Sequence, residues 1–184
     1  VNADAAVIQP IRGEVKGVVL SSSLRHSRRP GDAYAFSSLA IDEALRSAVA
    51  AGASLDSVAL LDNYCWSSST KPERLYELVE STRACYDMAI AYLTPFISGK
   101  DSMFNDFRGF SDTGESVHIA APPTLLISAI GHIDDVSRAQ TLDMQSVGDS
   151  IFLVGQTEDA LALSEYLVLI GGDTSRVYRG AHMP

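Results

Sequence analysis

The sequence predicts an α/β or α+β domain, in which a β-sheet carries two α-helices on one of its faces. Short apolar segments alternate with two longer segments whose apolar residues recur at helical spacing, a pattern typical of a sheet covered by helices. Hydrophobic residues make up 46% and charged residues 20%, as is ordinary for a folded domain, and the length of 184 residues suffices for one domain, or for one domain and part of another. The strand-like segments are residues 5–8, 15–20, 57–61, 95–98 and 124–130. Residues 106–115 are expected to form a loop; further on, residues 151–154 are expected to begin a new strand and residues 158–167 are helix-like.

The first two strand-like segments are predicted to pair as a hairpin, because Pro10 and Gly13 lie between them. Residues 21–31 follow. They are polar, include Arg25 and two further arginines, and end in Pro30-Gly31. We therefore expect this segment to be an exposed loop.

Two helices come next in the pattern. The first covers residues 32–51, with Asp32 as the candidate cap at its start. The second begins at a capping box formed by Thr70 and Glu73, and its apolar residues recur at helical spacing as far as Ile90. Because one helix follows the hairpin and the other separates two strands, both are expected on the same face of the sheet.

Polar residues follow two of the predicted strands directly. In open sheets ligands bind at the carboxyl ends of strands, so these residues are candidates for a ligand site. Turn formation by Asp and Asn is the alternative explanation. Gly99-Lys100 does not belong to a P-loop, because Thr94 stands where the first glycine of that motif is needed. The candidates are Asp62, Asn63, Lys100, Asp101 and Ser102.

Two residues of the first predicted helix are candidates for a metal site. Glu43 and Ser47 lie one turn apart, so both can face one bound ion. The alternative is an ordinary exposed acid on a helix. The four histidines show no zinc-ligand spacing, and no G-x-S-x-G elbow indicates a Ser-His-Asp triad.

Composition and charge exclude several classes of protein. With 23 acidic and 14 basic side chains the formal charge is −9, which argues against a nucleic-acid-binding protein. No apolar run approaches the roughly 20 residues that cross a bilayer, so no membrane partner is expected. The first residues lack the features of a secretion signal, and two cysteines, Cys65 and Cys85, are too few for a disulfide framework. We therefore expect a cytoplasmic protein with free thiols.

Four segments of the sequence form a specific pattern: residues 42–46, 61–66, 95–102 and 123–129. In this order and spacing they closely resemble phosphoribosylformylglycinamidine synthase, the enzyme that makes formylglycinamidine ribonucleotide (FGAM) in purine biosynthesis. The resemblance lies in the second of its two homologous halves and extends from about Asp4 to Val154. Thiamine-phosphate kinase and selenophosphate synthetase, of the same superfamily, fit the segments 62–66 and 99–102 less well.

The resemblance implies a fold and a division into domains. Each half of such a synthase is similar to an aminoimidazole ribonucleotide synthetase protomer, whose N-terminal sheet pairs with that of its partner half. Residues 1–135 are expected to form this N-terminal-like domain. Residues 136–184 are expected to be a linker and the incomplete start of an α/β C-terminal domain.

The resemblance also implies chemistry. The family is an ATP-dependent carbon–nitrogen ligase that converts formylglycinamide ribonucleotide (FGAR) to FGAM, with ammonia from glutamine and with Mg²⁺ at the phosphates. Its second half is similar to a degenerate copy that holds an auxiliary nucleotide. Glu43 matches a family metal ligand, Ser47 stands where the family has asparagine, and Asp4 is a further candidate.

From this we expect ATP or ADP and Mg²⁺ as cofactors, with the polar residues after the two strands contacting the nucleotide. No residue is expected to be catalytic, and the chain alone is expected to show no ligase turnover. The partner is expected to be a second copy or the other synthetase half, bound through the sheet. The alternative is a non-catalytic nucleotide-binding or dimerisation module of the same superfamily.

Overall fold

The computed structural model describes residues 4–28, 30–156, 166 and 169–171. It divides into two compact units, Val1–Leu142 and Asp143–Pro184, and all helices and strands given below belong to the first unit. The domain boundary expected after residue 135 stays a prediction.

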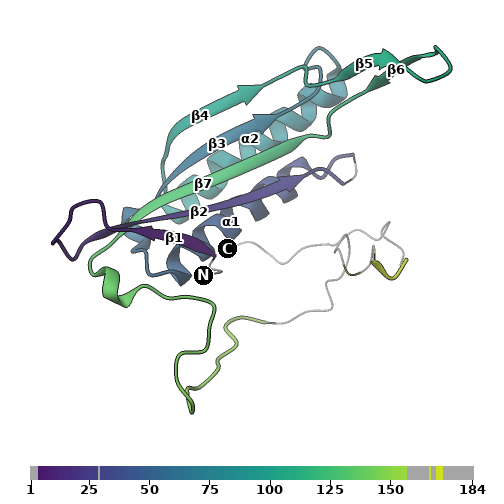
Figure 1. Ribbon diagram of the computed structural model, residues 1–184. Helices are drawn as coiled ribbons and strands as arrows, with labels where there is room; N and C mark the ends of the chain where they lie inside the picture. Colours follow the sequence, from purple (N-terminus) through teal and green to yellow (C-terminus); the bar gives the residue numbers. More distant parts are fainter. Residues whose placement is uncertain (1–3, 29, 157–165, 167–168, 172–184) are drawn as a thin grey trace. The chain divides into compact units, whose positions relative to one another are not determined.

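A five-stranded sheet forms the centre of the first unit (Figure 1). The strand order is β1-β2-β7-β3-β4; β3 and β4 run parallel, whereas the other neighbouring strands are antiparallel. The hairpin predicted at the start of the chain is confirmed by the pairing of β1 with β2. The strands are β1 (Ala5–Ile8), β2 (Gly17–His26), β3 (Ala59–Cys65), β4 (Phe96–Ser102) and β7 (Thr124–Ile133).

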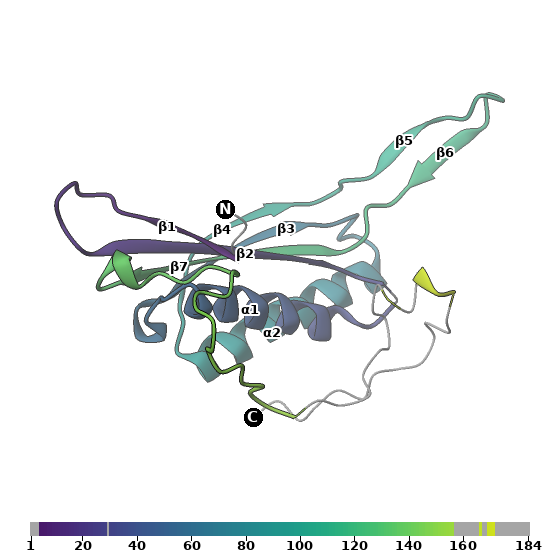
Figure 2. The same cartoon turned by 60° about the horizontal axis from the view of Figure 1, so that its bottom comes forward.

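Both helices, α1 (Ala33–Ala50) and α2 (Pro72–Tyr92), cover one face of this sheet, as Figure 2 shows. The predicted α+β arrangement is therefore confirmed. Asp32 is the N-cap residue of α1, as predicted, but its carboxylate makes no capping hydrogen bond and accepts from Ser27 and Arg28 of the preceding loop. The capping box predicted for α2 does not form, because Lys71 is its N-cap residue.

The core lies between the sheet and the two helices. Strand residues that alternate along β2, β3 and β7 point to the helices, as expected for a sheet with one covered face. Trp66, at the end of β3, is fully buried and donates its indole N–H to the Arg74 carbonyl at 3.0 Å, so it packs the strand end as a core residue. Fully buried core residues include Val19, Ala40, Ile41, Ala44, Leu60, Leu125 and Ile127.

The loop predicted at residues 21–31 is wrong over its first half, since β2 continues to His26. The whole strand is hydrogen-bonded to β7, and the buried Ser21 donates its hydroxyl to the Ala44 carbonyl of α1 at 2.6 Å. A polar strand is stable here because its buried hydroxyls have partners.

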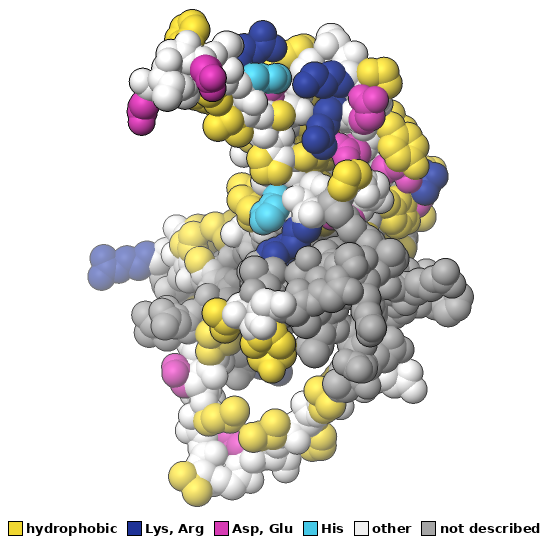
Figure 3. Space-filling model, turned by 90° about the vertical axis from the view of Figure 1, so that its right-hand side faces the viewer, with side chains coloured by type: hydrophobic (Ala, Val, Ile, Leu, Met, Phe, Trp, Pro, Cys, Tyr) yellow, Lys and Arg dark blue, Asp and Glu magenta, His cyan; other side chains and the backbone are white. Residues whose placement is uncertain are grey.

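A second correction concerns residues 106–115, which were expected to form a loop. Two short strands, β5 (Phe107–Phe110) and β6 (Ser116–Ile119), pair there as a hairpin. Figure 3 views the end where this hairpin lies, and hydrophobic side chains are exposed there among charged ones. Phe107 and Phe110 are 57% and 77% exposed.

In the second unit, residues 151–154 form no strand, contrary to the prediction. Their apolar side chains are 80% exposed or more, and within the described residues no other strand pairs with them. The helix predicted at residues 158–167 lies outside the described residues, apart from residue 166. No helix in the described part of the chain is long and apolar enough to cross a membrane.

Candidate functional site

The candidate ligand residues lie within two neighbouring strands, β3 and β4. The prediction that they follow the strands is therefore wrong. β3 continues through Asp62 and Asn63 because it is hydrogen-bonded on both sides, to β7 and to β4. In the parallel register Asn63 lies beside Lys100, and Tyr64 lies beside Asp101. Successive strand residues point to opposite faces, so the structure divides the predicted set into two groups.

The first group lies on the open face of the sheet, which is the face without helices. Asn63, Lys100 and Ser102 point this way, since they alternate with residues on the helix face. The Lys100 ammonium donates to the Ser102 hydroxyl at 3.2 Å. Asn105 donates its side-chain amide to the Ser102 carbonyl at 2.7 Å. This group offers one cation and several neutral polar atoms.

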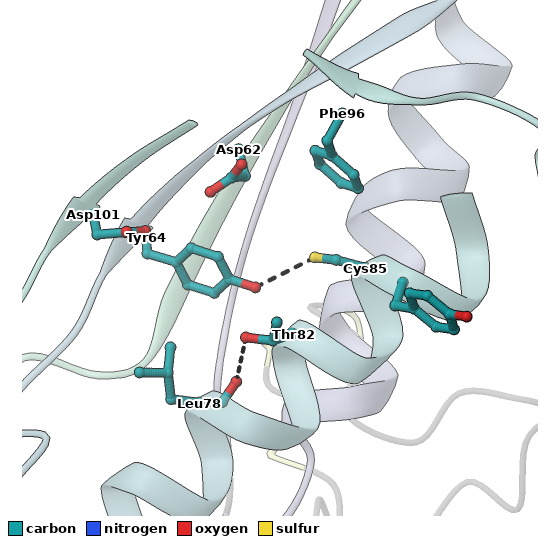
Figure 4. A pocket seen from close by; sticks show the side chains of 8 residues that line it. Asp62, Tyr64, Leu78, Thr82, Cys85, Phe96 and Asp101 are labelled. Atoms are coloured by element: carbon teal, nitrogen blue, oxygen red, sulfur yellow. Dashed lines mark hydrogen bonds between the residues drawn. The ribbon is translucent and has the colours of Figure 1, made fainter. Parts of the chain in front are cut away.

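The second group lies on the helix face and consists of Asp62 and Asp101. Both line a cavity of about 440 Å³ between α2 and the β3–β4 edge of the sheet (Figure 4). Gly99 lies beside Asp62 in the register, and a Cβ on Gly99 would overlap the Asp62 carboxylate. The carboxylate therefore occupies space that only a glycine at position 99 leaves free.

A buried hydrogen-bond chain leads from the wall of this cavity, where Tyr64 and Cys85 lie, to α1. The Tyr64 hydroxyl lies 3.3 Å from the Cys85 thiol and accepts from the Ser81 hydroxyl at 3.1 Å. Ser81 continues the chain to Ser37 of α1 at 2.6 Å. Burial raises the pKa of the Cys85 thiol to about 11 and also raises the pKa of Tyr64, so both groups are neutral at physiological pH.

Two of the candidate metal residues, Glu43 and Ser47, lie on α1, and the third, Asp4, lies before β1. Glu43 is half-buried on α1, accepts a hydrogen bond from Ser23, and forms an ion pair with Arg25 at 2.9 Å. Ser47 lies one turn further along α1 and is also half-buried. Asp4 precedes β1, whose first residue, Ala5, lies opposite Ser21 and packs against the core.

These residues fit Mg²⁺ held together with phosphate and water. The contacts of Glu43 with Ser23 and Arg25 both use Oε2, which leaves Oε1 without a partner among the described residues. Magnesium needs only one or two carboxylates when phosphate and water supply its remaining ligands. A metal site formed by protein side chains alone is not found in the described residues, because no group of three or more His, Cys, Asp or Glu there could hold an ion.

Ser23 and Arg25 were not predicted as neighbours of Glu43, because the polar run around them was assigned to a loop. The alternation of buried and exposed residues from Gly17 to Leu24 is visible only in the structure, since the sequence of this stretch does not alternate between apolar and polar residues. The cavity shared by Asp62 and Asp101 was not predicted either, since it depends on the register between β3 and β4.

The chain was compared with known proteins. No family model matches it. Phosphoribosylformylglycinamidine synthase subunit PurL of Thermoplasma acidophilum is 32% identical over 165 residues, which are 90% of this chain and 20% of that protein. Subunit PurL of Alkaliphilus metalliredigens is 33% identical over 174 residues, 92% of this chain and 21% of that protein. The chain belongs to the phosphoribosylformylglycinamidine synthase family. It spans about a fifth of the length of these PurL relatives.

Solved PurL structures share the fold. Thermotoga maritima PurL complexed with ADP superposes with a TM-score of 0.58 at 20% identity, covering 74% of this chain and 21% of that one. The same PurL complexed with ATP gives a TM-score of 0.55 at 21% identity, covering 74% of this chain and 21% of that chain. These matches confirm the synthetase-like α+β fold that the resemblance implied.

Proposed function

We propose that the chain is part of the second synthetase-like half of phosphoribosylformylglycinamidine synthase and contributes to the ATP-dependent conversion of FGAR to FGAM. The observation that carries this proposal is the 32% identity to a PurL subunit over 90% of the chain. The shared fold with Thermotoga maritima PurL supports it.

The proposal includes a nucleotide with Mg²⁺. Thermotoga maritima PurL has been solved in complex with ADP and with ATP. In this chain Glu43 and Asp4 would hold Mg²⁺ through carboxylate oxygens, with Ser47 binding at most a water ligand. Arg25, which is ion-paired to Glu43, supplies a positive charge for a phosphate oxygen.

The remaining predicted residues divide by charge. Asn63, Lys100 and Ser102 on the open face offer a cation and polar atoms to a nucleotide or to the second synthetase half. Asp62 and Asp101 offer two negative charges on the other face, which disfavour contact with phosphate. These two carboxylates are therefore not among the proposed phosphate contacts.

Genetic complementation tests this function. The complete coding sequence from which the chain derives is expressed in a bacterial purine auxotroph that lacks PurL, with the empty vector as control. Growth without added purine is the expected result. A soluble, well-expressed protein that fails to restore growth would overturn the ligase assignment.

A second candidate function is a nucleotide-binding or dimerisation module without turnover. The observation that favours it is the apolar surface of the open face, where Leu20 and Leu24 are 36% and 57% exposed. Failed complementation together with retained magnesium–ADP binding is the outcome that this module predicts and the ligase does not.

A further inference from the structure

The cavity between α2 and the β3–β4 edge has no role in the proposed nucleotide chemistry. It is open on one side, and its walls combine two carboxylates with three aromatic rings (Figure 4). Asp62 comes from β3, Asp101 from β4 and Tyr86 from α2; the other two rings belong to Tyr64 and Phe96.

The charge of this cavity is uncompensated. Neither Asp62 nor Asp101 takes part in an ion pair within the described residues, and no Lys, Arg or His is among the side chains that line the cavity. Asp62 is half-buried; burial, and to a smaller extent the nearby Asp101 charge, raises the pKa of its carboxyl, although a hydrogen bond from its own backbone N–H acts in the opposite direction. A half-buried carboxylate without a cationic partner is unfavourable, and a cation would compensate it.

The backbone of β4 is adapted to this arrangement. Asp62 lies over Gly99, where any side chain would overlap its carboxylate. Asp101 follows two residues later on the same face of β4, so both carboxylates face the same space.

The aromatic rings of the cavity favour a guanidinium over an ammonium ion. A planar, weakly hydrated guanidinium pairs with carboxylates through two hydrogen bonds and stacks on aromatic faces, whereas an ammonium ion is a compact and strongly hydrated charge. Tyr86 is 66% exposed, so its ring is accessible to a ligand at the mouth of the cavity.

We propose that this cavity binds a guanidinium group, which lies between the Asp62 and Asp101 carboxylates and against the aromatic walls. The proposal is independent of the synthase function. The group belongs either to a free small molecule or to an arginine side chain of another polypeptide segment, and both present the same chemistry.

Nuclear magnetic resonance titration of the 184-residue chain tests this site. The probes are butylguanidine and its uncharged counterpart butylurea, together with a blocked Gly-Arg-Gly peptide and its citrulline counterpart. We expect saturable shifts at the amides of β3, β4 and α2 with a guanidinium probe, and at least tenfold weaker binding of the matching urea. Tighter binding of butylguanidine identifies a small-molecule site, and tighter binding of the peptide identifies an arginine side chain.

Variants separate the site from non-specific attraction. Asp62→Asn is expected to weaken binding at least tenfold, and Tyr86→Ala about threefold. Asp62→Asn removes a charge whose burial is unfavourable, so this variant is expected to fold. The matched control is Asp112→Asn, which removes an exposed carboxylate from the β5–β6 turn and leaves affinity unchanged. No binding by the parent chain, or equal binding by Asp62→Asn, would overturn the proposal.

Discussion

At the scale of single residues, Glu43 is the side chain on which the proposed nucleotide site depends most. Its contacts to Ser23 and Arg25 fix the carboxylate through one oxygen and leave the other free. We predict that Glu43→Ala weakens magnesium–ADP binding by about tenfold or more, which is about 1.4 kcal/mol. Ser47→Ala should change the affinity little, because a hydroxyl is a poorer ligand than a carboxylate.

Isothermal titration calorimetry of magnesium–ADP measures both variants against the parent chain. Glu115→Ala, in the turn before β6, is the control for the loss of an exposed acid. Equal affinity of Glu43→Ala and the parent would exclude the site, and so would the absence of binding by the parent. Thermal unfolding of each variant shows whether the loss of the Arg25 ion pair disturbs the fold.

A second prediction concerns the two thiols, which are both free. Cys85 is buried and its pKa is raised to about 11, so its reactive thiolate is scarce at pH 8. Cys65 is only half-buried. We expect the Cys65→Ser variant, which retains Cys85, to react with Ellman's reagent at least tenfold more slowly than Cys85→Ser. Similar rates for the two variants would contradict this prediction.

At the scale of elements, β3 and β4 depend on each other through one close approach. A Cβ at position 99 would overlap the Asp62 carboxylate, and Gly99 has no positive φ that would strain another residue. We therefore predict that Gly99→Ala destabilises the chain by about 1–3 kcal/mol, as overpacking does elsewhere.

Gly99→Ala should lower the free energy of unfolding by less when the Asp62 side chain has been truncated to alanine. In the Asp62→Ala background Gly99→Ala has no carboxylate to displace, so urea unfolding of the four proteins should give a coupling energy of about 1 kcal/mol. Additive effects of the two substitutions would show that the overlap is absorbed elsewhere. Gly114→Ala, where a Cβ meets nothing within 4 Å but φ is +83°, isolates the backbone effect.

Most of these elements were predictable from the sequence, while their ends and faces were not. Apolar periodicity located both helices and the central strands, because burial in the core depends on it. Polar residues such as Ser21, Ser23 and Asp62 were assigned to loops, although hydrogen bonds and a glycine neighbour let them lie within strands. Which of them share a face depends on strand register, a long-range property that local patterns do not contain.

At the scale of the whole molecule, the open face of the sheet is the surface most suited to association. Leu24, Leu126 and Ile130 lie on it together with Leu20, as the β2–β7 register shows. We predict that the chain forms dimers, since one apolar sheet face can cover its equivalent in a second copy.

Size-exclusion chromatography with light scattering checks this prediction. Leu24→Lys should shift the chain to monomer, because it places a charge in the centre of the contact. Val79→Lys on α2 is the matched control, since Val79 is similarly exposed at 54% but lies on a helix. A parent chain that is monomeric at high concentration would exclude self-association through this face.

The position of β7 in the sheet has a consequence for synthesis of the protein. β7 lies between β2 and β3, yet it is the last of the five strands along the chain. While the chain emerges from the ribosome, the β1–β2 hairpin and the β3–α2–β4 unit therefore lack β7, the strand that pairs with both. Their apolar edges stay exposed until residue 133 has been translated, and such exposed edges are the surfaces that chaperones bind and that aggregate when folding is slow. The nascent chain thus depends on its most distant pairing to become a sheet.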